Sequence, residues 1–259
     1  MKFEAGPWKY TLSFAEMVQQ NETTKTKRDV RRRPQFVSAQ KKDEILKCRT
    51  KEKKENGASP GVSTPSHWVQ TSGSDTLVQV SGDLEEFKKV ASLFHKTLPN
   101  DKISKVMRNQ NIELWDIYRS KRERMIRRNG GKEVMELQLF HGTNPELVPA
   151  ISQQNFDWRI CGRNGTLYGK GSYFAQDSNY SKAYSGLDTK GKSRIMFVAR
   201  VLVGTFVRGQ SAYLRPPVKP PSLIDLHDSC VDNESNPTIF VIFEKDQVYP
   251  EYVIEYTST

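Results

Sequence analysis

The chain has 259 residues, of which 36% are hydrophobic and 27% charged, and its formal net charge is +10. This length suits one sizeable folded domain with a smaller unit attached. No apolar run reaches the roughly 18 residues of a membrane span, and the N-terminus lacks the apolar core of a signal peptide. We therefore expect an intracellular protein, in the nucleus or the cytoplasm, with no membrane insertion.

The cysteines and the charge distribution narrow the class further. Cys48, Cys161 and Cys230 are scattered and lack metal-ligand spacing, which argues against a disulfide framework and a structural zinc site. Residues 1–60 carry 15 Lys and Arg against 8 Asp and Glu, a balance of +7 out of the total of +10. This excess favours an anionic partner such as nucleic acid or a phosphorylated ligand. The alternative is a solvated tail, above all for the Lys-rich residues 41–54.

The first 38 residues are predicted to form a small β unit. Residues 8–14 alternate large apolar and polar side chains, which predicts a strand. Residues 15–21 form a short helix candidate, and residues 29–36 are predicted to form a basic final strand. Residues 39–65 lack periodicity and are rich in Lys, Glu, Gly, Ser and Pro, so they are predicted to be a flexible linker.

A larger folded region is expected over residues 66–259, and its first half is predicted to hold two long helices. A strand at 76–80 precedes a helix that begins at Asp83, where Glu86 three residues on resembles a capping box. A second helix starts near Ile112, and its charged end, residues 121–128, is interpreted as a solvated face rather than a nucleic-acid site. The Asn-Gly-Gly that follows ends it.

The second half of this region is predicted to supply most of the sheet. Residues 195–203 form a long apolar strand that is expected to be central, and residues 238–243 and 251–256 are two further strands. The prolines of residues 209–228 predict a long loop. The fold class is therefore α+β, with a mixed, mainly antiparallel β core and flanking helices.

Two motifs between these halves carry the candidate site. Residues 136–140 alternate polar and apolar side chains, which predicts a half-buried strand that delivers His141 at its end. Asn144 and Pro145 then favour a helix start, so His141 and Gly142 are expected at a strand-to-helix turn, where backbone groups can face a ligand.

The second motif, YGKGSYFA at residues 168–175, has a glycine on each side of Lys170 and places Tyr173 eight and eleven residues before Ser181 and Tyr184. Glycines let a flat ligand approach the backbone closely, and the two tyrosines can form faces around it. Taken alone, a single His is most often a structural residue of the core, and a GxG is most often a simple turn.

Together with FHGT at residues 140–143, these residues resemble the nicotinamide pocket of the poly(ADP-ribose) polymerase family, the diphtheria-toxin-like ADP-ribosyltransferases. The resemblance continues to the C-terminus and is greatest to the subgroup that combines CCCH zinc fingers, a WWE domain and a transferase domain. It implies the ADP-ribosyltransferase fold and an enzyme that uses NAD as co-substrate without a metal. It also implies that the loop at residues 155–167, including Arg159 and Arg163, covers the bound dinucleotide.

The resemblance also implies roles for individual residues. The backbone of Gly142 and the hydroxyl of Ser181 would bind the carboxamide of nicotinamide, and Tyr173 and Tyr184 would sandwich its ring. The catalytic His141 would hydrogen-bond the adenine-side ribose hydroxyl. Thr143 would support the same turn.

One position departs from the family's pattern. The chain-extending members carry a Glu directly before the run that is Phe240–Phe243 here, and this sequence has Ile239 in its place. Glu251 is a rival for that role but lies one strand later. Since isoleucine can neither accept a hydrogen bond nor activate a sugar hydroxyl, we predict transfer of a single ADP-ribose to an acceptor protein.

The N-terminal residues 10–34 resemble the C-terminal half of a WWE domain, a module that binds an ADP-ribose unit of poly(ADP-ribose) in some relatives. Gln19 and Arg28 match the residues used by the binders. Alternatively, the basic residues 31–34 form a patch that faces nucleic acid. For the whole chain, the alternatives to an active mono-ADP-ribosyltransferase are a catalytically weak NAD- or ADP-ribose-binding scaffold and a nucleic-acid-binding adaptor.

Overall fold

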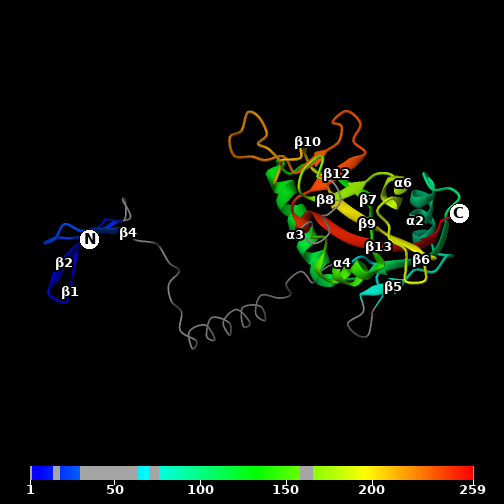
Figure 1. The fold of residues 1–259 in the computed structure, drawn as a ribbon, viewed down its shortest axis with the longest axis horizontal. Coiled ribbons are helices and arrows are strands. Elements are labelled where there is room, and N and C mark those ends of the chain that lie inside the picture. Colours follow the sequence, from blue (N-terminus) through cyan, green and yellow to red (C-terminus); the bar gives the residue numbers. More distant parts are fainter. Residues whose placement is uncertain (1, 14–17, 30–63, 70–75, 158–165, 259) are drawn as a thin grey trace. The chain divides into compact units, whose positions relative to one another are not determined.

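The computed structural model describes two separate compact units, Met1–Gly61 and Val62–Thr259 (Figure 1). The described residues are 2–13, 18–29, 64–69, 76–157 and 166–258. No helix within these ranges is long and apolar enough to cross a membrane. The free Cys230 is buried, and burial raises the pKa of its thiol to about 11.

The N-terminal unit is a four-stranded antiparallel sheet in the order β1-β2-β3-β4. Its strands are β1 (Lys2–Ala5), β2 (Trp8–Ser13), β3 (Val18–Asn21) and β4 (Lys27–Asp29). The helix predicted at 15–21 is therefore wrong for Val18–Asn21. Ladder pairing on both sides of β3, to β2 and to β4, outweighs the weak helical preference of the segment. Residues 15–17 and 30–36 lie outside the described ranges.

The larger unit contains one nine-stranded sheet in the order β10-β11-β12-β8-β7-β9-β13-β6-β5. All its ladders are antiparallel except the pairing of β10 with β11. Its strands are β5 (Leu77–Gln79), β6 (Lys102–Asn109), β7 (Glu136–Thr143), β8 (Ser172–Ala175), β9 (Arg194–Leu202), β10 (Phe206–Arg208), β11 (Ser229–Val231), β12 (Ile239–Ile242) and β13 (Val248–Thr257).

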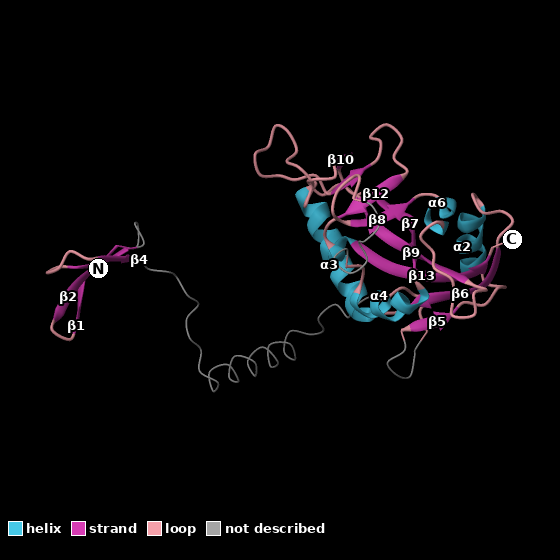
Figure 2. Cartoon of the chain, viewed as in Figure 1, coloured by secondary structure: helices cyan, strands magenta, loops and turns pink. Residues whose placement is uncertain are grey.

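Helices cover both faces of this sheet (Figure 2). Residues of α2 and α3 pack on one face in two separate clusters, and α4 packs on the other. The helical elements are α2 (Glu85–His95), α3 (Ile112–Arg128), α4 (Val148–Gln154), α6 (Ser178–Lys182) and the short 3-10 turns η1 (Pro145–Leu147) and η2 (Lys245–Gln247). The predicted α+β fold with a mainly antiparallel core is confirmed.

The central strand β9 is buried on both of its faces. Phe197, Ala199 and Val201 contribute to the core under α4, whereas Met196 and Val198 contribute to the core under α2. This explains the continuous apolar run in its sequence, because a strand that is buried on one face only would alternate. Strands β7 and β13 pair with β9 on its two sides.

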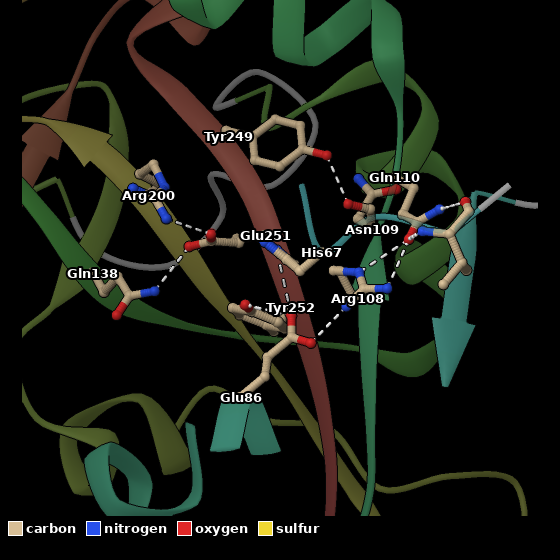
Figure 3. Close-up of polar contacts among 11 residues, drawn as sticks. His67, Glu86, Arg108, Asn109, Gln110, Gln138, Arg200, Tyr249, Glu251 and Tyr252 are labelled. Carbon is tan, nitrogen blue, oxygen red and sulfur yellow. Dashed lines mark hydrogen bonds and ion pairs between the residues drawn. The ribbon is translucent and has the colours of Figure 1, made fainter. Parts of the chain in front are cut away.

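Strand β13 contains a bulge that buries Glu251. The register with β9 shifts between Pro250 and Tyr252, and the extra residue lets Tyr249 and Tyr252 pack on the same face despite their odd spacing. The Glu251 carboxylate accepts hydrogen bonds from Arg200, at 2.5 Å, and from Gln138, at 2.8 Å. Figure 3 shows both bonds. The buried carboxylate is thus fully engaged within the sheet.

Residues 64–69 dock on the same unit through a polar network (Figure 3). The Gln110 side chain bonds the backbone of Val69 twice, accepting from its N–H at 3.0 Å and donating to its carbonyl at 2.7 Å. The Arg108 guanidinium donates to Gln110 and to Glu86, and Tyr252 donates to Glu86. This short segment therefore belongs to the larger unit.

The structure corrects the expected start of the first long helix. Helix α2 begins at Glu85, and its N-cap residue Leu84 makes no side-chain capping bond. The Asp83 carboxylate instead accepts a hydrogen bond from the Ser81 hydroxyl. Helix α3 starts as expected, with the Asn111 side chain accepting from the Leu114 N–H at 3.1 Å.

Candidate active site

The candidate site lies where two neighbouring strands separate. Strand β7 pairs with β9 along its whole length, but it pairs with β8 only at Phe140 and Ala175. Beyond this point the side chain of His141 links the two strands, since its Nδ1 lies 2.7 Å from the Tyr173 carbonyl oxygen. The interrupted ladder leaves space between the end of β7 and the start of β8.

A cavity of about 690 Å³ lies at this separation. All seven residues predicted for the transferase site line it, namely His141, Gly142, Thr143, Tyr173, Ser181, Tyr184 and Ile239. The other described lining residues are Asn144, Leu147, Thr166, Leu167, Tyr168, Lys170, Gly171, Ser172, Phe174, Ala175 and Tyr180. The structure therefore brings together residues that are up to about a hundred positions apart in the sequence.

His141 is held in one tautomer by its surroundings. A carbonyl oxygen can only accept, so Nδ1 donates to Tyr173 and leaves Nε2 as the acceptor atom of the neutral ring. The ring packs edge-on against Phe156, with centroids 4.9 Å apart, and in a tilted arrangement against Phe174, with centroids 5.4 Å apart. Burial lowers the pKa of His141, and the bond to the Tyr173 carbonyl only partly offsets this. The imidazole is therefore neutral at pH 7.

Tyr173 is fixed at its hydroxyl end. The hydroxyl donates to the Gly169 carbonyl at 2.9 Å and accepts from the Tyr168 N–H at 2.9 Å. Both bonds close the turn that carries the YGKG motif back onto its own strand. The ring of Tyr173 is consequently a fixed wall of the cavity, with its hydroxyl already satisfied by protein groups.

Gly142 stands directly against α6. A Cβ added to this residue would lie 2.0 Å from the carbonyl oxygen of Ser181 and 2.9 Å from the carbonyl carbon of Tyr184. No side chain fits there, so the backbone of β7 and the wall formed by α6 approach each other as closely as two chains can. The Thr143 carbonyl accepts from the Gly186 N–H at 3.0 Å, which fixes the same turn from the other side.

The two tyrosines near α6 form an exposed pair at the cavity. Tyr180 and Tyr184 have ring centroids 5.6 Å apart and planes tilted by 42°, and their hydroxyl oxygens lie 3.4 Å apart. Tyr184 remains 42% exposed. Burial and the neighbouring Tyr184 raise the pKa of Tyr180, so the Tyr180 hydroxyl stays protonated at neutral pH. Open aromatic faces of this kind suit a flat ligand.

Ile239 lines the cavity from β12, where it pairs with Ala175 of β8. Its backbone N–H donates to the Asp232 carboxylate at 3.0 Å, and that carboxylate also accepts from the N–H and hydroxyl of Thr238. No Asp or Glu occurs among the described residues that line the cavity. Glu251 in particular does not, because it is buried in the β13 bulge.

Sequence reasoning assigned no role to Lys170 and Tyr180, which also line the cavity. Lys170 is the single Lys or Arg among the described lining residues, and its backbone N–H donates to the Tyr213 carbonyl at 2.8 Å. Its place between two glycines in the YGKG motif was the available signal. Tyr180 directly precedes Ser181. Its position in the sequence does not show on which side of α6 its side chain lies, because a helix of five residues is too short for a hydrophobic pattern.

The remaining sequence predictions fall elsewhere. Arg159 and Arg163 of the predicted covering loop lie outside the described residues. In the N-terminal unit, Gln19 and Arg28 face each other as register partners on β3 and β4. Within the described ranges, no group of His, Cys, Asp and Glu is arranged to hold a metal ion.

Residues 84–258 match the model of the poly(ADP-ribose) polymerase catalytic domain, and residues 1–32 match the WWE domain. The first match covers well over half of the sequence, so the chain belongs to the family of poly(ADP-ribose) polymerase catalytic domains. The family that the sequence motifs indicate is therefore confirmed.

Individual relatives define the similarity further. The chain is 48% identical to "Protein mono-ADP-ribosyltransferase PARP12" of Homo sapiens, over 100% of the chain but 36% of the relative. It is 38% identical to "Protein mono-ADP-ribosyltransferase PARP11" of Homo sapiens, over 99% of the chain and 78% of the relative. The chain thus spans about a third of PARP12. A resemblance to the family member numbered twelve, which the motifs also indicate, is confirmed.

Proposed function

We propose that the protein is an NAD-dependent protein mono-ADP-ribosyltransferase, which transfers one ADP-ribose from NAD to a protein side chain and releases nicotinamide. The observation that carries this proposal is a cavity that combines the His141, Tyr173 and Tyr184 set with a wall that lacks any described carboxylate. Family membership and the names of the relatives PARP12 and PARP11 support it.

The residues around Gly142 suit the nicotinamide end of NAD. A planar ring needs flat faces and a close approach to backbone, and Tyr173, Tyr184 and Gly142 offer both. Stacking on such faces contributes about 0.5–1.5 kcal/mol beyond burial. The Ser181 hydroxyl lies at the same wall, where it can bond a carboxamide. A ring held in this way becomes a good leaving group in a fixed direction.

His141 suits a hydrogen bond to a ribose hydroxyl. Its Nδ1–H is used by the Tyr173 carbonyl, so the neutral ring offers the Nε2 lone pair as an acceptor. A hydroxyl bound there is oriented without moving a proton. The role is therefore to position the sugar, and position accounts for much of the rate in a reaction that proceeds through an oxocarbenium-like sugar.

Ile239 supports the limitation to a single transfer. In the transfer step, the bond between the ribose C1′ and nicotinamide breaks with its electron pair leaving on nicotinamide, and an acceptor oxygen forms a new bond to C1′. A carboxylate of an acceptor protein needs no base for this attack. A sugar hydroxyl does, and Ile239 supplies neither a base nor an acceptor atom.

The proposal is tested by incubating the purified chain with labelled NAD and measuring the products by intact mass and gel electrophoresis. We expect gains of single ADP-ribose units, which are lost in His141→Ala and Tyr173→Ala. Long polymers made by the unaltered chain would contradict the role of Ile239. No labelling together with measurable binding of NAD would favour the alternative, a catalytically weak NAD-binding scaffold.

We further propose that the N-terminal unit binds poly(ADP-ribose) through Gln19 and Arg28. The match to the WWE domain supports this, as does the pairing of the two residues across β3 and β4, which places an amide beside an exposed guanidinium. Binding of labelled poly(ADP-ribose) to the full chain and to Arg28→Ala tests it. Competition by a single-stranded RNA of equal charge would instead support the nucleic-acid interpretation, and the salt dependence of both should be measured.

We propose the following division of the chain: a WWE-like segment at 1–38, a linker at 39–65 and the transferase domain at 66–259. The domain matches at 1–32 and 84–258 and the two compact units support it. The two hydrogen bonds between Val69 and Gln110 support a start of the transferase domain before residue 69. Limited proteolysis followed by mass analysis tests these boundaries.

A further inference from the structure

The wall that carries Ser181 and Tyr184 is too short to hold itself in place. Helix α6 has only five residues, Ser178–Lys182, and no side chain caps its N-terminus. Helices shorter than about 12 residues are marginal when isolated, so its position must come from contacts with the rest of the domain. Those contacts are not equally distributed around it.

On the side of the cavity, the backbone of α6 and of the turn after it lies directly against β7. The Ser181 carbonyl lies where a side chain on Gly142 would be, and the following turn bonds β7 through the Gly186 N–H and the Thr143 carbonyl. The Ser185 carbonyl also accepts from Arg194 at 2.5 Å. These contacts limit how close α6 can come to β7, but they provide no ionic attachment.

On the opposite side, two hydroxyls attach α6 to the last turn of α2, at Phe94, and to the connection between α2 and β6, at Thr97. The Ser178 hydroxyl donates to the Phe94 carbonyl at 2.6 Å and lies 2.8 Å from the Thr97 hydroxyl oxygen. The Thr97 oxygen also accepts from the Asn179 N–H at 3.1 Å. Thr97 thereby bonds both a side chain and a backbone group in the first turn of α6.

The last turn of α6 is attached to the same connection by an ion pair. Lys182 Nζ lies 2.7 Å from Asp101 Oδ2 and 3.0 Å from Asp101 Oδ1. Asp101 is only 5% exposed. A carboxylate that is so deeply buried needs a partner, so Lys182 cannot move away without a large cost. The two attachments lie at the two ends of one helix and oppose its rotation.

Resting on the proposed function, we propose that Thr97 and Asp101 are positioning residues for the nicotinamide end of the site. They hold α6 from behind, and α6 places the Ser181 hydroxyl and the Tyr184 ring. None of Thr97, Asp101, Ser178 and Lys182 is among the described residues that line the cavity. Their effect on the ligand is therefore indirect and selective for the part of NAD that meets this wall.

The selectivity can be measured with two fragments of NAD, namely nicotinamide and ADP. The variant is Thr97→Val, which keeps the shape of the side chain and removes the hydroxyl, and its matched control is Thr97→Ser, which restores it. Lys182→Met with the control Lys182→Arg tests the ion pair in the same way. Dissociation constants of both fragments are determined by calorimetry on the full chain, and thermal unfolding reports on folding.

We expect Thr97→Val and Lys182→Met to raise the dissociation constant of nicotinamide about tenfold or more and to leave that of ADP within about twofold. Thr97→Ser and Lys182→Arg should restore nicotinamide binding to within about threefold. A merely structural role would weaken both fragments together, and that result would overturn the inference. Unchanged nicotinamide binding in folded Thr97→Val would also overturn it.

The unaltered chain separates this inference from the proposed function. If it binds neither nicotinamide nor NAD, the proposed function fails and the inference fails with it. If it binds both and the variants behave alike, only the inference fails. Lys182→Met leaves Asp101 without its partner, so Thr97→Val remains the deciding variant if Lys182→Met does not fold.

Discussion

The nine-stranded sheet consists of two regions that are built differently. From β7 through β9 and β13 to β6, the ladders are long, and the central strands β9 and β13 are buried on both faces. From β7 to β8 the ladder is reduced to one pair of residues, and the cavity lies beside it. The first region holds the aromatic and aliphatic core and a buried ion network. The second presents glycines, tyrosines and a short helix.

The difference separates stability from ligand binding. In the first region, side chains have partners within the protein: Phe197 packs against Phe156, and Arg200 donates to Glu136 and Glu251. In the second, groups such as the Nε2 of His141 and the ring of Tyr184 are left available. Changes in the first region should therefore act on the free energy of unfolding, and changes in the second should act mainly on affinity and rate.

The largest expected effect is on stability, from Phe197→Ala in β9. Phe197 is fully buried and packs against Phe156 with ring centroids 5.5 Å apart. Loss of such a ring costs about 3–5 kcal/mol, because it leaves a cavity. Urea unfolding measures the change. The matched control Leu223→Ala, at a side chain that is 90% exposed, should change the free energy by less than about 0.5 kcal/mol. Equal effects would contradict the division.

A slightly smaller loss is expected from Arg200→Met. Arg200 donates to Glu251 at 2.5 Å and to Glu136 at 2.8 Å, and its removal leaves the buried Glu251 without a cation. Breaking a buried pair costs about 3–5 kcal/mol, and the lower end applies because the Arg200 side chain is 31% exposed. Adding Glu251→Gln should recover part of this loss. Strict additivity of the two changes in urea unfolding would show that they are not coupled.

Gly142→Ala should act chiefly on the ligand. The new Cβ would overlap the Ser181 carbonyl and force α6 away from β7, so nicotinamide affinity should fall about tenfold or more. Overpacking of this kind lowers the free energy of unfolding by about 1–3 kcal/mol. Gly82→Ala is the control, since nothing lies within 4 Å of its added Cβ. Binding that is unchanged in Gly142→Ala would contradict the close approach.

The smallest effect concerns the titration of His141. Its pKa is lowered in the folded protein, so between that value and the ordinary 6.5 the unfolded chain binds more protons. The contribution of His141 to the free energy of unfolding is fully present above pH 6.5. It decreases as the pH falls below 6.5, by at most about 1.4 kcal/mol per pH unit. NAD affinity should fall only at lower pH, as the pH approaches the lowered pKa of the folded protein, because the ring becomes protonated there and then has no acceptor atom.

This titration is measured by comparing urea unfolding at pH 7.5 and 5.5 in the unaltered chain and in His141→Gln. Other groups contribute to both proteins and cancel in the difference. Because the pKa of His227 is also lowered by burial and by Lys219, His227→Gln serves as the control. A pH dependence that is identical in the unaltered chain and His141→Gln would contradict the assignment.

Much of the nine-stranded sheet could be predicted from the sequence, because several of its strands have strong hydrophobic patterns. The apolar run of residues 195–203 corresponds to β9, and the strands expected at 238–243 and 251–256 correspond to β12 and β13. The strand β6 was missed, since Lys102–Asn109 has few large apolar residues and acquires its conformation from pairing with β13 and β5. The three-residue strands β10 and β11 are too short for a pattern.

The candidate site was predictable as a set of residues but not as a shape. The resemblance of the motifs gave His141, Tyr173 and Ile239, and all three line one cavity. The separation of β7 from β8 could not be derived, because both strands have ordinary sequences and the gap arises from where their pairing ends. Likewise Thr97 and Asp101 lie some 80 residues before their partners in α6, and no periodicity connects them.

The narrow junction between β7 and β8 has a mechanical consequence. The junction divides the sheet into two groups of strands, one with β8, β12, β11 and β10 and the other with β7, β9, β13, β6 and β5. Within the sheet, one ladder pair and the His141 side chain join these two groups of strands at the site, so we expect the sheet to bend more easily there than along its continuous ladders. A ligand that contacts both groups of strands would restrict their motion relative to each other. Filling the cavity should therefore stiffen the domain as a whole, and amide exchange along β8 should slow more than exchange along β9.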